Sequence, residues 1–266
     1  KLLLELSQRT GRGSDHVIKY AAYEDGDEMG LAVGRVLLAM ELCECSLHQI
    51  VSERGLQVPL EQQLRIVREL SEAVDFIHRR GGVIHRDIRP KNVLFMGVAE
   101  GRPAYEGTVK LADFGLAKDV DVREMDQSQT NSMYSSQDGK EPGSAGYYAK
   151  EVWEEEKISN KTDVFSLGCV FFYIFSGGKR PFDKPSNPGN KMTTVINICN
   201  GTSVNLWLIE RDYPEVHNLV SAMVRPEREL RPSAAQVLEH LLFWPHERRF
   251  EFLCDVGSER DVGSGA

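Results

Sequence analysis

The sequence predicts an α+β chain in which a short part with strands precedes a mainly helical body. Two runs typical of strands, residues 17–22 and 35–42, lie near the start, and an acidic turn that contains glycine joins them. Farther along, apolar residues recur with a helical period. The composition, with 27% charged and 41% hydrophobic residues among 266, is ordinary for a soluble globular protein and excludes collagen-like, strongly disordered and membrane-spanning chains.

The predicted elements begin with a short apolar helical stretch, residues 2–6, which ends in a segment containing two glycines, residues 11–15. Residues 60–80 predict an amphipathic helix, because apolar side chains recur there every three or four positions and a glycine pair follows. We interpret the polar segment 119–142 as a mobile loop. The remaining predicted elements are strands at residues 83–84, 93–95 and 109–112, and helices at residues 162–176, 215–224 and 233–242.

Charge and cysteine content limit the function classes. The formal net charge of −8 argues against a nucleic-acid binder that works by bulk positive charge, although a local basic patch stays possible. The five cysteines show no spacing typical of a zinc site, and their odd number favours reduced thiols in an intracellular setting. The most apolar run, residues 164–175, is about half of what a bilayer span requires. The chain itself is therefore expected to make no membrane contact.

The segment that decides the function prediction is His85-Arg86-Asp87-Ile88-Arg89-Pro90-Lys91-Asn92, and 26 positions after Asp87 the chain reads Asp113-Phe114-Gly115. Either segment alone is a weak signal, because acidic residues beside glycine are common in turns. Together, and in this order, they resemble the catalytic loop and metal-binding triplet of the protein kinases. The alternative interpretation is that Asp87 and Asp113 are carboxylates that cap turns.

The resemblance implies a protein-kinase-like fold, with an incomplete strand-bearing upper lobe and a complete, mainly helical lower lobe. It also implies ATP and Mg²⁺ as cofactors. Asp87 would orient the attacking hydroxyl, and Asn92 and Asp113 would hold the magnesium ion through oxygen ligands. Arg89 stands where Ser/Thr kinases usually have a catalytic-loop lysine; it keeps the charge but is planar and bulkier. Arg86 would be available to pair with a phosphorylated activation loop.

Further matches cover most of the chain. Residues 143–147 resemble the loop that faces the protein substrate, with serine where the family usually has threonine. Residues 149–151 read Ala-Lys-Glu where kinases read Ala-Pro-Glu, and the resemblance implies that Glu151 pairs with Arg231. The lysine in place of proline could loosen the end of the activation segment. Asp163 resembles the residue that anchors the catalytic loop from the helix below it.

Residues 40–43 resemble the gatekeeper and hinge of a kinase. By this resemblance the backbone of Glu41 and Cys43 would hydrogen-bond adenine, and Leu94 would form the floor under it. The alternative for Met40 and Leu94 is plain core packing, which both would supply in either case. In the polar loop five hydroxyl residues are candidate phosphorylation sites, although such loops are commonly just solvated: Ser128, Thr130, Ser132, Ser135 and Ser136.

The end of the chain resembles one subfamily. Residues 243–260 are similar to the junction of kinase and ribonuclease domains in the inositol-requiring kinase/endoribonucleases, the unfolded-protein sensors of the endoplasmic reticulum. The alternative is an ordinary Ser/Thr kinase whose last helix happens to look similar. The resemblance implies a partial upper lobe at residues 1–42, a lower lobe at residues 43–245, and the start of a ribonuclease domain at residues 246–266. We then expect the glycine-rich loop and strand lysine to precede the given sequence, and this chain alone to bind ATP weakly.

Three functions stay open on the sequence. The first is a Ser/Thr kinase that mainly phosphorylates itself as a dimer. The second is a nucleotide-binding regulatory module that controls an attached ribonuclease, through which alone the protein would contact RNA. The third is an inactive kinase fragment. The resemblance places this part in the cytosol, with the parent protein at the endoplasmic reticulum membrane.

Overall fold

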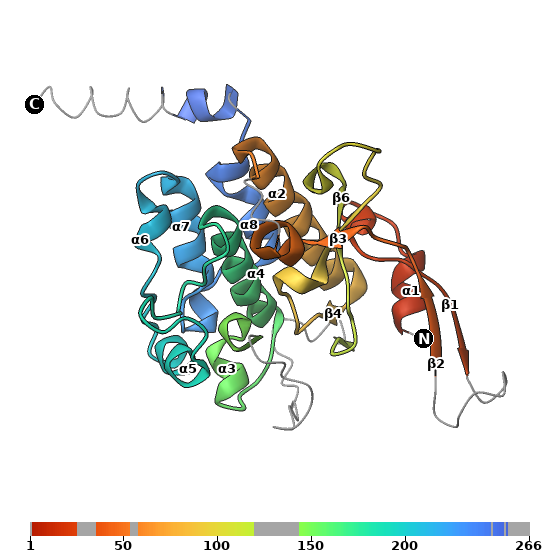
Figure 1. The fold of residues 1–266 in the computed structure, drawn as a ribbon, viewed down its shortest axis with the longest axis horizontal. Coiled ribbons are helices and arrows are strands. Elements are labelled where there is room, and N and C mark those ends of the chain that lie inside the picture. The colour runs from red at the N-terminus through yellow and green to blue at the C-terminus, as the bar shows by residue number, and fades with distance from the viewer. Residues whose placement is uncertain are drawn as a thin grey trace, which may run out of the picture.

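The computed structural model describes residues 2–25, 36–53, 58–119, 144–245, 247–252 and 254. Figure 1 shows a small part with α1, β1 and β2 at one side of the molecule and a larger helical part at the other. Strands come mainly from the first half of the chain and helices predominate in the second half, as the sequence predicts. The fold is therefore α+β.

The strands of the described residues form three small antiparallel sheets, with the orders β1-β2, β3-β5-β6 and β4-β7. The first strand begins later than predicted, because Val17 forms a bridge with Leu111 and the Ile18 N–H donates to the Leu111 carbonyl at 2.9 Å. The strands are β1 (Tyr20–Asp25), β2 (Val36–Met40), β3 (Cys45–Ser46), β4 (Val83–Ile84), β5 (Val93–Met96), β6 (Thr108–Leu111) and β7 (Lys118–Asp119).

The predicted helices are present with shifted ends, and the sequence analysis missed α3, α5 and α6. A capping box, in which Ser159 and Thr162 satisfy each other's backbone N–H groups, starts α4. The helices are α1 (Leu2–Gln8), α2 (Leu60–Phe76), α3 (Lys150–Trp153), α4 (Asn160–Phe175), α5 (Lys191–Cys199), α6 (Trp207–Glu210), α7 (Pro214–Met223) and α8 (Ala234–Glu239). None of the helices in the described ranges is long and apolar enough to cross a membrane.

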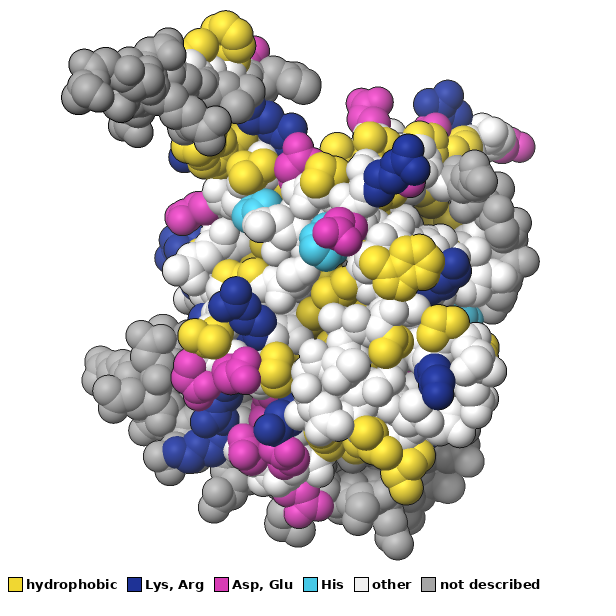
Figure 2. Space-filling view, turned by 90° about the vertical axis from the view of Figure 1, so that its left-hand side faces the viewer, with side chains coloured by type: hydrophobic (Ala, Val, Ile, Leu, Met, Phe, Trp, Pro, Cys, Tyr) yellow, Lys and Arg dark blue, Asp and Glu magenta, His cyan; other side chains and the backbone are white. Residues whose placement is uncertain are grey.

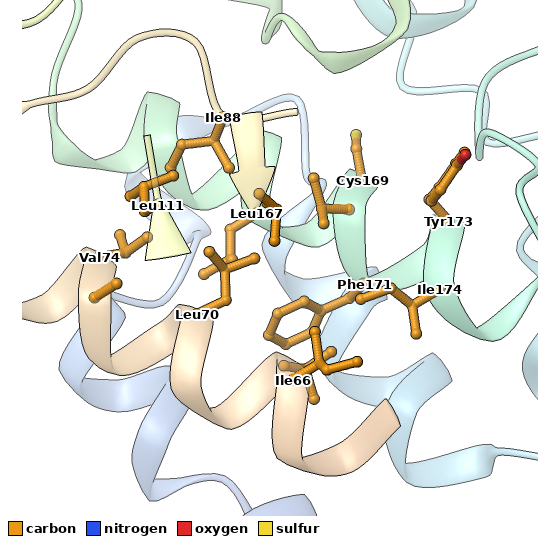
Figure 3. Packing of buried hydrophobic residues seen from close by; sticks show 14 of the residues in the cluster. Ile66, Leu70, Val74, Ile88, Leu111, Leu167, Cys169, Phe171, Tyr173 and Ile174 are labelled. Carbon is orange, nitrogen blue, oxygen red and sulfur yellow. The ribbon is translucent and has the colours of Figure 1, made fainter. Parts of the chain in front are cut away.

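The main hydrophobic core lies around α4, whose residues from Thr162 to Phe175 are all buried. Figure 3 shows Leu70 and Val74 of α2 on one side of this core, with Leu167 of α4 opposite them. Ile88, next to Asp87 in the sequence, belongs to the same core and is fully buried. The loop that carries the candidate catalytic residues is thus anchored in the main hydrophobic core.

One packing expectation is wrong. Met40 is 54% exposed and Leu38 is 43% exposed. Ala39 between them is exposed too, so no described residue covers either face of this end of β2. Leu94, in contrast, is half-buried and packs against the core. The five candidate phosphorylation sites of the polar loop lie outside the described residues. All five cysteines are free thiols.

Candidate active site

The segment with Asp87 is held from below by Asp163 of α4. The backbone N–H groups of His85 and Arg86 each donate to an oxygen of the Asp163 carboxylate at 2.8 Å. His78 Nε2 contacts the same carboxylate at 2.8 Å, and Asp163 is fully buried. Arg86 has a φ of 68°, a left-handed conformation that is unusual for a residue other than glycine. These contacts confirm the predicted role of Asp163 as the anchor of the loop.

Two buried titratable groups beneath the site have shifted pKa values. Burial raises the pKa of Asp163, but the hydrogen bond and charge of His78, the charge of His85 and the Arg86 N–H together lower it below its ordinary value. Burial lowers the pKa of His85 more than the carboxylates of Asp163 and Asp87 raise it. His85 is therefore neutral beside an ionised Asp163.

The hydrogen bonds of His85 determine its tautomer. Nε2 lies 3.1 Å from the carbonyl of Ala112, which can only accept, so Nε2 carries the proton. Nδ1 then accepts from the backbone N–H of Asp87 at 3.3 Å. The ring also packs on Phe114, with 4.5 Å between ring centroids. His85 thus connects the segment with Asp87 to the segment with Asp113.

The carboxylate of Asp87 accepts hydrogen bonds from three side chains. Its Oδ2 accepts from Arg89 Nε at 3.1 Å and from Asn92 Nδ2 at 2.8 Å. Its Oδ1 accepts from the Tyr148 hydroxyl at 3.0 Å. A carboxylate oxygen can accept about two hydrogen bonds, so these donors leave one acceptor position at Oδ1. The contribution of Tyr148 was not predicted from the sequence.

Asn92 and Asp113 lie at the same end of the β5–β6 pair. The Ala112 N–H donates to the Asn92 carbonyl at 2.9 Å, so Asp113 follows directly from the residue paired with Asn92. Asp113 has a φ of 66° and an exposed side chain, and its Oδ1 accepts from the Gly115 N–H at 3.3 Å. No group of three or more His, Cys, Asp or Glu side chains in the described ranges could hold a metal ion. One carboxylate and one amide oxygen nevertheless fit magnesium, which keeps several waters and is bound partly by phosphates.

The candidate hinge follows β2 and is tied to β6. The Glu41 N–H donates to the Lys19 carbonyl at 3.0 Å. The Glu41 carboxylate lies 2.8 Å from the ammonium group of Lys110, a residue that is only 2% exposed. Cys43 and Leu94 line one cavity of about 420 Å³, whereas Glu41 is not part of its lining. Burial raises the pKa of Cys43, so its thiol stays protonated. Lys110 was not identified from the sequence.

The predicted pairing of Glu151 with Arg231 is confirmed. The two guanidinium NH groups of Arg231 donate to the two oxygens of Glu151 at 2.7 and 3.0 Å. Thr162 of α4 donates to Glu151 at 2.8 Å, and Arg231 lies over the ring of Phe165. Both members of the pair are buried, so the segment after the 3₁₀ turn Ser144–Tyr147 is fixed to the core.

The sequence profile of the family described as "Protein kinase domain" matches residues 5–243. The chain therefore belongs to the protein kinase domain family, and it is a kinase by fold and by sequence. Members of this family use ATP and a divalent metal ion.

The relatives found include "Serine/threonine-protein kinase/endoribonuclease IRE2" of Homo sapiens, 30% identical over 95% of this chain and 25% of the relative. "Serine/threonine-protein kinase/endoribonuclease IRE1a" of Arabidopsis thaliana is 33% identical over 77% of this chain and 22% of the relative. The Caenorhabditis elegans protein "Serine/threonine-protein kinase/endoribonuclease ire-1" is 30% identical over 91% of this chain and 23% of the relative. The chain thus spans about a quarter of the length of these relatives.

Proposed function

We propose that this chain transfers the γ-phosphoryl group of ATP to serine or threonine hydroxyls, including those of its own activation segment, within a kinase/endoribonuclease of the unfolded-protein response. The observation that carries the proposal is the carboxylate of Asp87, which three donors orient with one acceptor position left. Phosphoryl transfer depends mainly on such positioning and on charge stabilisation, because the protein supplies little covalent chemistry.

In the proposed reaction Asp87 accepts a hydrogen bond from the attacking hydroxyl at its remaining Oδ1 position and then takes up the proton. Arg89, whose side chain is mostly buried and whose Nε contacts Asp87, keeps the carboxylate fixed in position. Because Asp87 is 6% exposed, few water molecules can compete with the acceptor hydroxyl.

Adenine would lie on Leu94 and hydrogen-bond to the backbone of Glu41 and Cys43. The ion pair of Glu41 with Lys110 and the cavity lined by Cys43 and Leu94 support this placement. Asn92 and Asp113 would hold Mg²⁺. The Nδ2 of Asn92 is engaged with Asp87, so its amide oxygen is the end that stays available for a cation. The ion supplies neutralisation of the phosphate charges when bound.

The partners proposed are ATP, a second copy of the chain and, through a ribonuclease domain like that named in the relatives, RNA. The names of the relatives support this combination, since each joins kinase and endoribonuclease. A location on the cytosolic side of the endoplasmic reticulum membrane is part of the same proposal.

The test is phosphate transfer by the whole proposed kinase/endoribonuclease and by its Asp87→Asn variant, with ³²P-labelled ATP and Mg²⁺. We expect transfer to fall by at least about a hundredfold in the variant, because the amide cannot accept the proton. Binding of ATP, measured by calorimetry, should stay within about threefold. Asp15→Asn, a change of the same kind at a carboxylate 82% exposed and far along the chain from the site, is the control. Equal transfer by wild type and Asp87→Asn would contradict the proposal.

A further inference from the structure

A second cavity lies outside the candidate active site. Its volume is about 620 Å³, and it opens between the connector that follows α4 and the segment that leads into α6. Figure 2 shows the side of the molecule that carries α5, α6 and α7, where hydrophobic side chains lie among scattered basic ones. None of the residues assigned above to catalysis or nucleotide binding lines this cavity.

Asn205 is a polar residue of the cavity wall, and its side-chain amide is fixed by hydrogen bonds. Its Nδ2 donates to the carbonyls of Arg180 at 2.8 Å and Asp183 at 2.7 Å, and its backbone N–H donates to Pro181 at 3.1 Å. The side chain is 4% exposed, and its Oδ1 has no hydrogen-bond partner in the described part of the chain. Since both amide hydrogens are engaged, the orientation of the amide is determined. Oδ1 is shielded from solvent, so the role of this amide is to hold the wall of the cavity in place.

The walls of the cavity are mostly apolar. Trp207 is 63% exposed, and its Nε1 donates to the Val204 carbonyl at 3.1 Å, so the ring is oriented but uncovered. Pro185 and Pro188 are exposed on the connector and line the same cavity. A rigid aromatic ring beside prolines is the kind of surface on which an apolar side chain of a peptide packs at low entropic cost.

The rim of the cavity is positively charged. Lys179 and Lys184 are exposed and have no ion pair in the described ranges. Arg180, in contrast, is paired with Asp183 at 2.6 Å. The two lysines are thus the charges that a ligand would meet, and they are complementary to acidic side chains although the chain as a whole carries −8.

The cavity also adjoins the segment that would face a protein substrate. Gly146 lies in the 3₁₀ turn Ser144–Tyr147, and a Cβ atom placed on it would be 2.9 Å from Cδ of Arg180. Arg180 lines the cavity, so the turn and the cavity share a wall. A protein held with a hydroxyl at Asp87 would therefore pass close to this cavity.

We propose that this cavity binds an extended, acidic peptide segment of the acceptor protein, away from the hydroxyl that is phosphorylated. An acidic side chain of the segment contacts Lys179 and Lys184, and an apolar side chain packs on Trp207. The proposal rests on the proposed kinase function, because the acceptor protein is the partner that the site at Asp87 requires.

The experiment measures fluorescence anisotropy of a labelled short peptide, in which glutamates flank a leucine, with the full chain. The same peptide with glutamine in place of each glutamate is the matched ligand control. We expect the Lys179→Glu/Lys184→Glu variant and the Trp207→Ala variant each to weaken binding by about tenfold or more. These side chains are exposed, so the variants should fold; Asn205 variants are avoided because they would break the connector. Arg80→Glu, a charge reversal at an exposed position outside the cavity, should bind as wild type does.

Several outcomes would overturn the proposal: equal binding of the glutamate and glutamine peptides, an unchanged affinity in both cavity variants, or an equal loss in Arg80→Glu. Displacement of the peptide by single-stranded RNA with the same dependence on the lysines would show a nucleic-acid surface instead. The Asp113→Asn variant separates this proposal from the kinase proposal. Asp113→Asn should lose phosphate transfer and keep peptide binding. The kinase proposal and the peptide-binding proposal can therefore fail independently.

Discussion

The hydroxyl of Tyr148 donates a hydrogen bond to Oδ1 of Asp87 at 3.0 Å, across 61 positions of the chain. Both side chains are buried, Tyr148 to 4% exposure and Asp87 to 6%. Tyr148 belongs to a small hydrophobic cluster with Ile84, Val152 and Ile158, so its ring is held by packing while its hydroxyl reaches the carboxylate. Tyr148, which directly follows the segment expected to face the protein substrate, therefore helps to orient the residue proposed as the base.

We predict that Tyr148→Phe lowers the turnover number for phosphate transfer by roughly tenfold, with the KM for ATP unchanged. The variant keeps the ring and removes one of the three donors that fix Asp87, so the carboxylate samples unproductive orientations. Steady-state kinetics with a peptide acceptor makes the measurement.

Tyr213→Phe is the matched control, because its ring packs on Phe175 away from the site and no hydrogen bond of its hydroxyl is found in the described ranges, so its turnover should be unchanged. A faster reaction in Tyr148→Phe would mean that Tyr148 competes with the acceptor hydroxyl and does not support it.

The buried pair of Glu151 and Arg231 should contribute far more to stability than a surface pair of the same chemistry. Glu151→Gln leaves the guanidinium of Arg231, which is 1% exposed, without its counter-charge, and we expect a loss of about 3–5 kcal/mol in the free energy of unfolding. Glu229→Gln breaks the pair with Arg228, in which the Glu229 side chain is 71% exposed, and should cost no more than about 1 kcal/mol. Urea denaturation of both variants makes the comparison, and equal losses would show that burial does not govern the cost.

For the ion pair of Glu41 and Lys110 at the candidate hinge, we expect the two single substitutions to change the free energy of unfolding by different amounts, because the two side chains are unequally buried. The side chain of Lys110 is 3% exposed and that of Glu41 is 23% exposed. Glu41→Gln leaves the more deeply buried charge alone and should destabilise the chain more than Lys110→Met, which leaves a carboxylate that still accepts from the Lys19 N–H at 2.9 Å.

The double variant should lose less than the sum of the two single losses, and chemical denaturation gives this coupling energy. If the losses are additive, the two residues do not interact in solution. A parallel calorimetric titration with Mg-ATP tests whether weakening of this pair also weakens nucleotide binding, as the proposed hinge requires.

The parts of the fold and site that could be predicted from the sequence are those with a local pattern. The periodic apolar residues of α2 and the contiguous motif around Asp87 are visible in short windows, and the pairing of Glu151 with Arg231 follows from motifs on both sides. Tyr148 and Lys110 were missed because their partners lie 61 and 69 positions away, with no local pattern to indicate them. The exposure of Met40 could not be predicted either, since an apolar strand residue reads the same whether or not another element covers it.

The neutral, buried His85 predicts how stability depends on pH. Its folded pKa lies below the ordinary value of 6.5, so below about pH 6.5 the unfolded chain takes up a proton that the folded chain does not. The free energy of unfolding is therefore expected to be greatest above that pH and to decrease as the pH falls toward 5. Urea denaturation at several pH values in this range should show that the free energy of unfolding changes less with pH in His85→Phe than in wild type. That variant should nevertheless be less stable at every pH.

His240 has a pKa that burial also lowers, and it contributes to the same dependence with the same sign. His240→Asn should thus remove only part of the change in the free energy of unfolding with pH. If that change is the same in His85→Phe as in wild type, the assignment of His85 as neutral in the folded chain is contradicted.

The last prediction concerns the contact between α4 and α7. Gly168 lies within α4, and a Cβ atom placed on it would be 2.8 Å from Cβ of Met223 and 2.9 Å from Cγ1 of Val224. In an exposed helix interior, replacing glycine by alanine stabilises by up to about 1 kcal/mol. Here the added methyl group forces α7 away from the core, so we expect Gly168→Ala to lower the free energy of unfolding by about 1–3 kcal/mol. Combining it with Val224→Ala removes one of the two close contacts, and the double variant should lose less than the sum of the single losses. A higher urea midpoint for Gly168→Ala, with an unchanged dependence of the free energy of unfolding on urea concentration, would show that helix propensity outweighs the clash. It would also show that α4 and α7 pack less closely than the distance of 2.8 Å implies.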